Sequence, residues 1–98
     1  MMMNKINLAL QVLPKSSNKE TYALVDKAIE IIEQSGIKYK VCPFETVLEG
    51  YYDELMEIVK KVHEHCYASG TETMMTYIKI QSSATDDVTI EDKMEKYS

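Results

Sequence analysis

The chain contains no arginine and no tryptophan, and the missing arginine narrows its possible partners. All 11 basic residues are lysines, and together with 16 acidic residues they give a formal net charge of −5. Recognition of phosphate groups and guanine edges usually relies on the planar, bidentate guanidinium of arginine. An acidic chain with scattered lysines also lacks the basic surface of a nucleic-acid-binding protein. We therefore expect no nucleic-acid partner.

Long apolar runs are absent as well. A membrane-spanning helix needs roughly 18 or more consecutive apolar residues, and no stretch of this sequence reaches that length. The first residues lead directly into a strand pattern, without the apolar region and small-residue cleavage site of a secretory signal. These features predict a cytoplasmic protein that makes no membrane contact.

Cysteine is scarce, and its placement argues against both a disulfide and a metal site. Cys42 and Cys66 form no C-x-x-C pair and fall in different predicted elements. In a reducing compartment such residues are usually packing groups. His63 and His65 lie close to Cys66, but no fourth ligand follows at a spacing typical of zinc sites. We expect free cysteines and no bound metal.

The 98 residues are enough for one domain, 1–98, with a modest core that oligomerisation would help to stabilise. Apolar periodicity predicts strands at 6–13, 37–42, 46–49 and 73–80. Pro14 is expected to end the first strand, because proline cannot donate to the ladder. The capping-box spacing of Ser17 and Glu20 predicts the start of a helix, and Ser35-Gly36 predicts its end.

A second helix is predicted after Gly50 and ends at Ser69-Gly70. Its apolar residues recur at helical spacing; they are Leu55, Ile58, Val59, Val62 and Cys66. The tail, residues 89–97, is expected to form a short helix capped by Thr89.

The order strand–helix–strand therefore occurs twice and is followed by a tail. Right-handed crossovers place both helices on the same face of one sheet. The resulting fold class is α/β (α+β), a ferredoxin-like βαββαβ sandwich with a four-stranded antiparallel sheet, two helices on one face and a short C-terminal helix. This arrangement leaves the other sheet face uncovered.

Alternation along the first and last predicted strands indicates which side chains this open face carries. Pointing toward the helices are Leu8, Leu10, Val12, Ile78 and Ile80, and pointing away are Ala9, Gln11, Leu13, Met75, Tyr77 and Lys79. A solvated face is normally more uniformly polar than this mixture. We expect the open face to pack against another copy as a homodimer or homotetramer, with a ligand pocket at or near that interface.

Several segments resemble the small thiamine-binding (YkoF-like) proteins. They are the strand that ends in Pro14, the stretch Ser-Gly-Ile-Lys-Tyr-Lys-Val-Cys-Pro at 35–43, the stretch Thr-Val-Leu-Glu-Gly at 46–50, the stretch Thr-Tyr-Ile-Lys-Ile at 76–80, and Lys93. The resemblance runs across nearly the whole chain, and the Pro-x-x-Thr-x-x-Glu-Gly segment with the later Ile-Lys-Ile is its most specific part. Departures occur at 44–45 and 81–83, near the expected pocket rim.

The resemblance implies non-catalytic binding of thiamine or its hydroxymethylpyrimidine moiety, with thiamine as ligand and no further cofactor. Glu49 maps onto the family motif and is expected to supply a carboxylate to the cationic thiazolium. Thr46 and Gln11 are expected to donate or accept hydrogen bonds, and Tyr77 to form an aromatic wall. Lys79 is expected to pair with Glu49 or with a neighbouring subunit. Gln11 and Tyr77 enter this set from strand alternation alone.

The sequence also bears on two other function classes, an enzyme and a self-associating module. An enzyme of this fold class would resemble acylphosphatase, whose chemistry needs an arginine to hold phosphate. The sequence also offers no glycine-rich phosphate loop and no recognisable nucleophile–base arrangement, so we expect no enzyme. The alternative to a ligand-binding protein is a regulatory or scaffold module that self-associates through its open sheet face without a small ligand.

Overall fold

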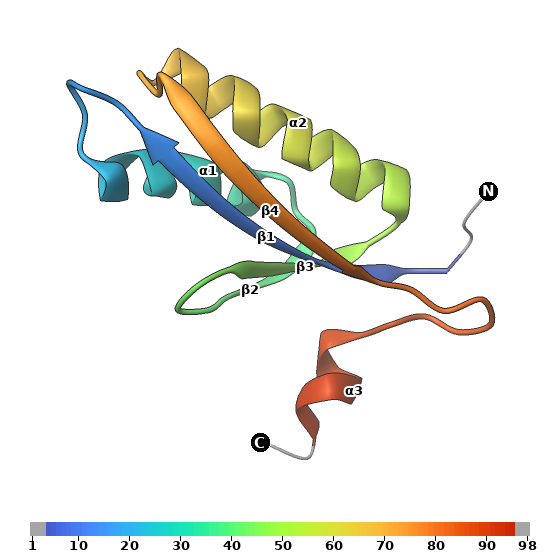
Figure 1. Cartoon of the computed structure of the whole chain (residues 1–98). Coiled ribbons are helices and arrows are strands. Elements are labelled where there is room, and N and C mark those ends of the chain that lie inside the picture. Colours follow the sequence, from blue (N-terminus) through green and yellow to red (C-terminus); the bar gives the residue numbers. More distant parts are fainter. Residues whose placement is uncertain (1–3, 96–98) are drawn as a thin grey trace.

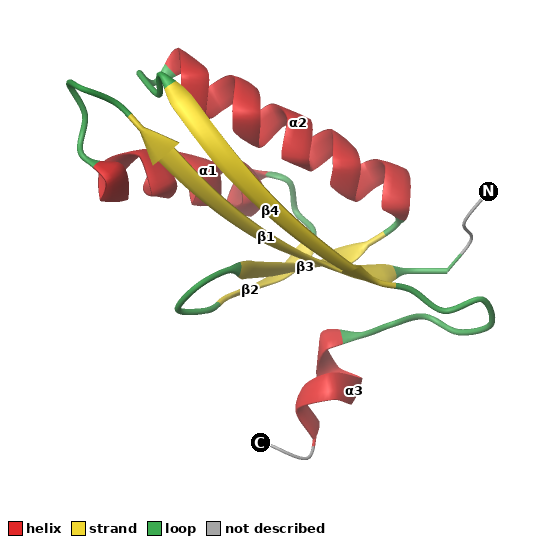
Figure 2. Cartoon of the chain, viewed as in Figure 1, coloured by secondary structure: helices red, strands yellow, loops and turns green. Residues whose placement is uncertain are grey.

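The computed structural model describes residues 4–95, and its elements follow the predicted order. They are β1 (Ile6–Lys15), α1 (Thr21–Gln34), β2 (Lys38–Val41), β3 (Thr46–Gly50), α2 (Tyr52–Ala68), β4 (Thr73–Gln81) and α3 (Ile90–Met94). The strands form one antiparallel sheet in the order β2-β3-β1-β4. Helices α1 and α2 lie along one face, while α3 lies apart from them near the lower end of the sheet (Figures 1 and 2). The ferredoxin-like prediction is confirmed.

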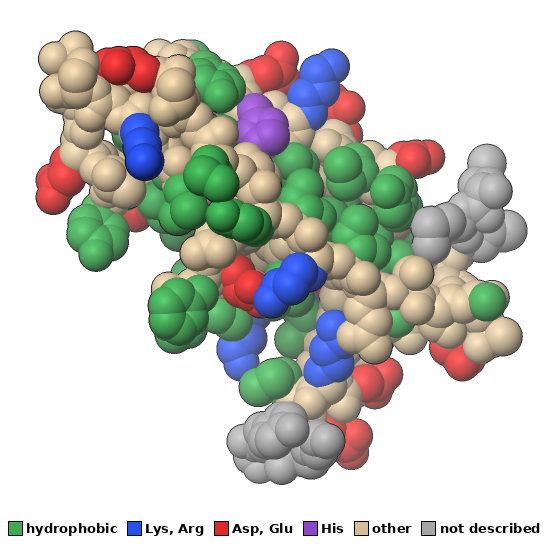
Figure 3. Space-filling model, in the orientation of Figure 1, with side chains coloured by type: hydrophobic (Ala, Val, Ile, Leu, Met, Phe, Trp, Pro, Cys, Tyr) green, Lys and Arg blue, Asp and Glu red, His purple; other side chains and the backbone are tan. Residues whose placement is uncertain are grey.

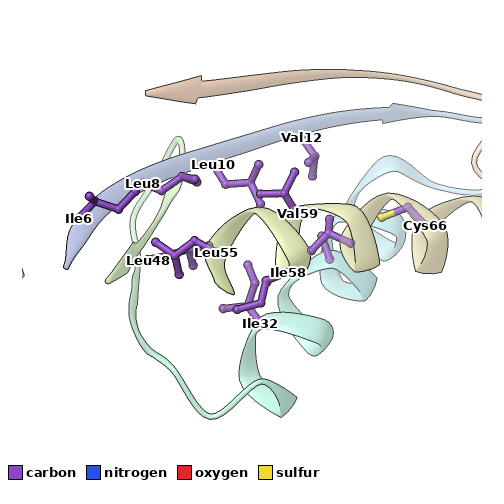
Figure 4. Packing of buried hydrophobic residues seen from close by; sticks show 12 residues of the cluster. Ile6, Leu8, Leu10, Val12, Ile32, Leu48, Leu55, Ile58, Val59 and Cys66 are labelled. Carbon is purple, nitrogen blue, oxygen red and sulfur yellow. The ribbon is translucent and has the colours of Figure 1, made fainter. Parts of the chain in front are cut away.

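The core lies between the sheet and the two long helices. Strand β1 contributes alternate residues, of which Ile6 and Leu8 are completely buried. Helix α2 presents the predicted apolar stripe, and all five of its members are buried. Figure 4 shows these side chains meeting between β1 and α2, with Ile32 of α1 packed against them. The apolar residues that alternate along β1 and those that recur at helical spacing along α2 therefore pack against each other in one core.

The strand register confirms the predicted faces of the sheet. Leu10 lies directly opposite Ile78, and both point toward the helices, whereas Gln11 lies opposite Tyr77 on the open face. Directly opposite residues share a face because side chains alternate along each strand. Thr46 is opposite Leu10 and so belongs to the helix-covered face.

Two local predictions are wrong. Strand β1 continues through Pro14, which pairs with Met74 of β4. The β1–β3 register ends at Leu10, so β1 is an edge on that side at Pro14, where a missing N–H is tolerated. Ser17 does not cap α1. The helix begins at Thr21, and the Ser17 hydroxyl and backbone N–H donate to Glu72 Oε2 at 2.7 and 3.0 Å.

The helix ends agree with the sequence. Gly36 and Gly70 both adopt positive φ, 78° and 113°, a conformation that residues with a Cβ rarely adopt. The Thr89 side chain accepts a hydrogen bond from the Asp92 backbone N–H and so caps α3 as predicted. The tail prediction extends to residues 96–98, which lie outside the described residues.

The contacts of Glu72 make stability depend on pH. Hydrogen bonds from Ser17 lower the pKa of Glu72 below its ordinary value, so the charged form favours the folded state. This stabilisation is complete above the ordinary carboxyl pKa and is lost as the pH falls through the lowered pKa. Glu72→Gln should therefore lower the urea midpoint at neutral pH but not in acid.

The matched control is Glu33→Gln, which removes the same charge from an exposed position of α1. Urea unfolding across the acid range checks the prediction. A Glu72→Gln effect that is equally large below the carboxyl range would contradict it.

Candidate functional site

Two pockets of similar size adjoin the sheet. The first lies among β1, α1 and the β2–β3 connection and encloses about 380 Å³. It is lined mainly by apolar side chains, and its polar members include Gln11, Thr21, Glu45 and Thr46. The second also encloses about 380 Å³ and lies between the open face and α3; we call it the α3 pocket. Both volumes fall within the range of small-molecule sites.

The α3 pocket combines an apolar interior with charged groups. Ala9 and Val47, which lie directly opposite each other on the open face, line it from the sheet. Ile90 and Met94 line it from α3. The charged lining residues are Lys40, Glu45, Lys79 and Lys93. A flat ring placed between the sheet and α3 would thus contact apolar groups and have charged groups within reach.

Helix α3 is held over the open face by two buried or partly buried hydrogen bonds. Glu49 Oε1 accepts from the backbone N–H of Ile90 at 2.7 Å, a charge-assisted bond at the start of the helix. Asn7 Nδ2 donates to the carbonyl oxygen of Val88 at 2.9 Å. Asn7 and Glu49 are themselves directly opposite each other on β1 and β3. The Lys5 backbone adds two bonds to the same segment: its carbonyl oxygen accepts from the Val88 N–H at 3.0 Å, and its N–H donates to Asp87 Oδ1 at 2.8 Å.

An exposed contact adds to this anchorage. Lys38 Nζ lies 2.7 Å from Glu91 Oε1, and the hydrogen bond raises the pKa of Lys38. Exposed pairs of this kind contribute little to stability. The attachment of α3 therefore depends mainly on the bonds that Lys5, Asn7 and Glu49 make to residues 87–90.

Charge in the pocket is mostly positive. Lys79 Nζ lies 3.0 Å from Glu45 Oε1, so its partner is Glu45 and not Glu49 as the sequence suggested. Partial burial lowers the pKa of Lys93, which disfavours its charged form. Figure 3 shows lysine side chains gathered around one carboxylate between the β2–β3 connection and the C-terminal helix.

The five predicted ligand-binding residues are not brought into one cavity. Gln11 and Thr46 line the first pocket and Lys79 lines the α3 pocket. Tyr77 lies opposite Gln11 on the open face. Glu49 is engaged by α3.

Sequence reasoning missed Asn7 and Lys40 as pocket residues. Strand alternation could have identified Asn7, which shares its face with Ala9 and Gln11. Lys40 required the β2–β3 register, in which it faces Val47. Lys93 was noted in the resemblance, but its position in the pocket depends on α3 folding back over the sheet.

The residues considered for metal binding have other contacts. His63 Nε2 lies 2.7 Å from Thr76 Oγ1, and Cys66 is a free, buried thiol whose pKa is raised by burial. Cys42 is also free. Within residues 4–95, no three or more histidine, cysteine or carboxylate side chains are grouped to hold a metal ion. Over the same range, every helix is too short or too polar to cross a membrane.

Removing the Glu49 carboxylate should release α3 without unfolding the domain. A hydrogen bond to a charged group contributes about 1.5–3 kcal/mol. In Glu49→Ala, amide hydrogens of α3 should therefore exchange roughly 10 to 100 times faster, while core amides of β1 change little. Hydrogen exchange followed by NMR measures both.

Glu91→Ala serves as the control, because it removes an equal charge from α3 that is engaged only in an exposed pair. It should alter exchange by less than about threefold. Unchanged exchange of α3 in Glu49→Ala would show that this carboxylate does not hold the helix.

Comparison with known proteins identifies the family. The family model described as "Thiamine-binding protein" matches residues 8–98. A UPF0045 protein of Clostridium perfringens is 41% identical over 95 residues, which cover 97% of this chain and 99% of that protein.

Solved structures agree. A DUF77 domain from Bacillus cereus has a TM-score of 0.93 and 39% identity, covering 97% of this chain and 91% of that one. A Thermotoga maritima protein, proposed to act in thiamine biosynthesis or salvage, has a TM-score of 0.87 and 30% identity, covering 96% of this chain and 99% of that one. With the fold and nearly the full length matched, the chain belongs to the thiamine-binding protein family.

Proposed function

We propose that this protein binds thiamine or its hydroxymethylpyrimidine moiety in the α3 pocket, in the cytoplasm and without catalysing a reaction. The observation that carries the proposal is the α3 pocket itself, where apolar side chains from the sheet and α3 lie beside polar and charged groups. Sites for small ligands typically combine an apolar lining with a few polar groups that fix orientation. Family membership favours a thiamine-related ligand.

The predicted residues take different places in this proposal. Lys79 lines the pocket, and Glu49 positions its α3 wall. Gln11 and Tyr77 lie two residues farther along the same face than Ala9 and Lys79, so they would contact the part of a ligand that extends beyond the slot. Thr46 lies on the other face and would reach a ligand only through the first pocket.

We further propose that a second copy covers the part of the open face beyond the α3 pocket. Leu13, Met75 and Tyr77 lie on this part of the face and are exposed. An apolar group of this kind on a sheet face favours association. A homodimer or homotetramer formed in this way would place the ligand near the subunit interface.

Thiamine binding is tested by calorimetric titration into protein that has been unfolded, freed of bound ligand and refolded. We expect saturable binding at micromolar affinity or better, because the volume of the pocket falls within the range of small-molecule sites. Ala9→Leu should abolish binding by filling the α3 pocket. Tyr22→Ala, which enlarges the first pocket instead, should leave it unchanged.

A flat titration with folded protein would reject the ligand and favour the regulatory or scaffold module. Loss of binding in Tyr22→Ala but not in Ala9→Leu would move the site to the first pocket.

Self-association is tested by placing a charge among the exposed apolar side chains of Leu13, Met75 and Tyr77. Tyr77→Lys should reduce the mass in solution to that of one chain, because burying an unpaired ammonium at an interface is costly. Light scattering after gel filtration measures the mass. Tyr67→Lys is the matched control, since Tyr67 and Tyr77 are both 49% exposed and Tyr67 lies on α2. A monomeric wild-type protein, or equal effects of the two variants, would contradict an interface on the open face.

A further inference from the structure

The α3 pocket has a charge opposite to that of the chain. Among residues 4–95, those that line the pocket include three lysines, Lys40, Lys79 and Lys93, and one carboxylate, Glu45. Three positive charges and one negative charge give a local net charge of +2, whereas the chain carries −5. The lysines come from β2, β4 and α3, so only the folded chain brings them together.

Two of these lysines are not neutralised by a neighbour. Lys79 pairs with Glu45, but Lys40 and Lys93 form no ion pair within residues 4–95. The exposed Lys27 and Lys38, in contrast, each lie beside a glutamate. Partial burial lowers the pKa of Lys93, and a bound anion would restore the stability of its ammonium form.

A buried polar atom gives an independent indication that the pocket takes a ligand. Asn7 is 2% exposed and lines the pocket. Its Nδ2 donates to Val88, which fixes the orientation of the amide. Its Oδ1 has no hydrogen-bond partner in the part of the chain that the structure describes. Buried polar atoms are normally paired, so an acceptor of this kind suits an N–H donor on a bound ring.

We propose that the α3 pocket binds a phosphate ester of a flat, amino-bearing heterocycle, with the phosphate between Lys40 and Lys93 and the ring donor directed to Asn7 Oδ1. This inference rests on the proposed function and specifies it further: the preferred ligand is the phosphorylated form. A free thiamine cation would enter a pocket of like charge, whereas a phosphate carries about −1.5 to −2 charges at neutral pH. Lysine binds phosphate as a point charge and needs no arginine fork.

The test compares thiamine with thiamine monophosphate by calorimetric titration. We expect the wild-type protein to bind the phosphate ester at least about tenfold more tightly, because each charge-assisted contact is typically worth about that factor. The preference should shrink as ionic strength rises. The double variant Lys40→Gln/Lys93→Gln should bind the phosphate ester no more tightly than thiamine.

Two further variants test whether the charge of the pocket lining, and not of the surface in general, sets the preference. Lys60→Gln removes an equal charge from an exposed position of α2 and should keep the full preference. Glu45→Gln removes the one carboxylate among the described lining residues and should tighten binding of the phosphate ester. If the double variant fails to fold, Lys40→Gln alone, at an exposed position of β2, should reduce the preference about tenfold.

The outcomes separate this inference from the proposed function. Equal affinities for the two compounds, or a preference that survives in the double variant, would overturn the phosphate site while leaving thiamine binding intact. Binding of neither compound would reject both proposals, unless inorganic pyrophosphate binds and the double variant abolishes that binding. In that case the anion site is supported and thiamine is rejected as its ligand.

Discussion

The alternation of β1 is the constraint on which the rest of the structure depends. This strand lies between β3 and β4 and presents Ile6 and Leu8 to the helices. A shift of one residue would exchange the two faces and bury Asn7 and Gln11 in the core. The large cost of that exchange fixes the register of both neighbouring strands, and so determines which residues remain on the open face.

The open face is then partly covered by the chain itself. Asn7 and Glu49, a cross-strand pair on this face, bind the backbone at Val88 and Ile90. These bonds turn a short, exposed helix into one wall of the α3 pocket. A carboxylate that the sequence suggests for binding a cation is thus used to hold α3. The net positive charge of the pocket comes from its three lysines.

The distribution of charge links this architecture to recognition. The chain is acidic as a whole, yet three lysines that lie far apart in the sequence line one pocket. In such a confined space, nearby charges act more strongly than the distant charges of the remaining surface, which salt screens. The net charge of the chain therefore describes its general surface and not the α3 pocket. The absence of arginine does not prevent a small anion from binding, because lysine binds phosphate as a point charge.

By itself, the sequence determined the order of the elements, the sheet faces and the C-terminal ends of α1 and α2. These features follow from short-range rules: the two-residue period of strands, the helical stripe from Leu55 to Cys66, and glycine at positive φ. Tertiary structure alone decided that Ser17 binds Glu72, that Lys79 pairs with Glu45, and that α3 folds back onto Glu49. Each of these contacts joins segments about 30 to 60 residues apart, so neither periodicity nor capping patterns could predict them.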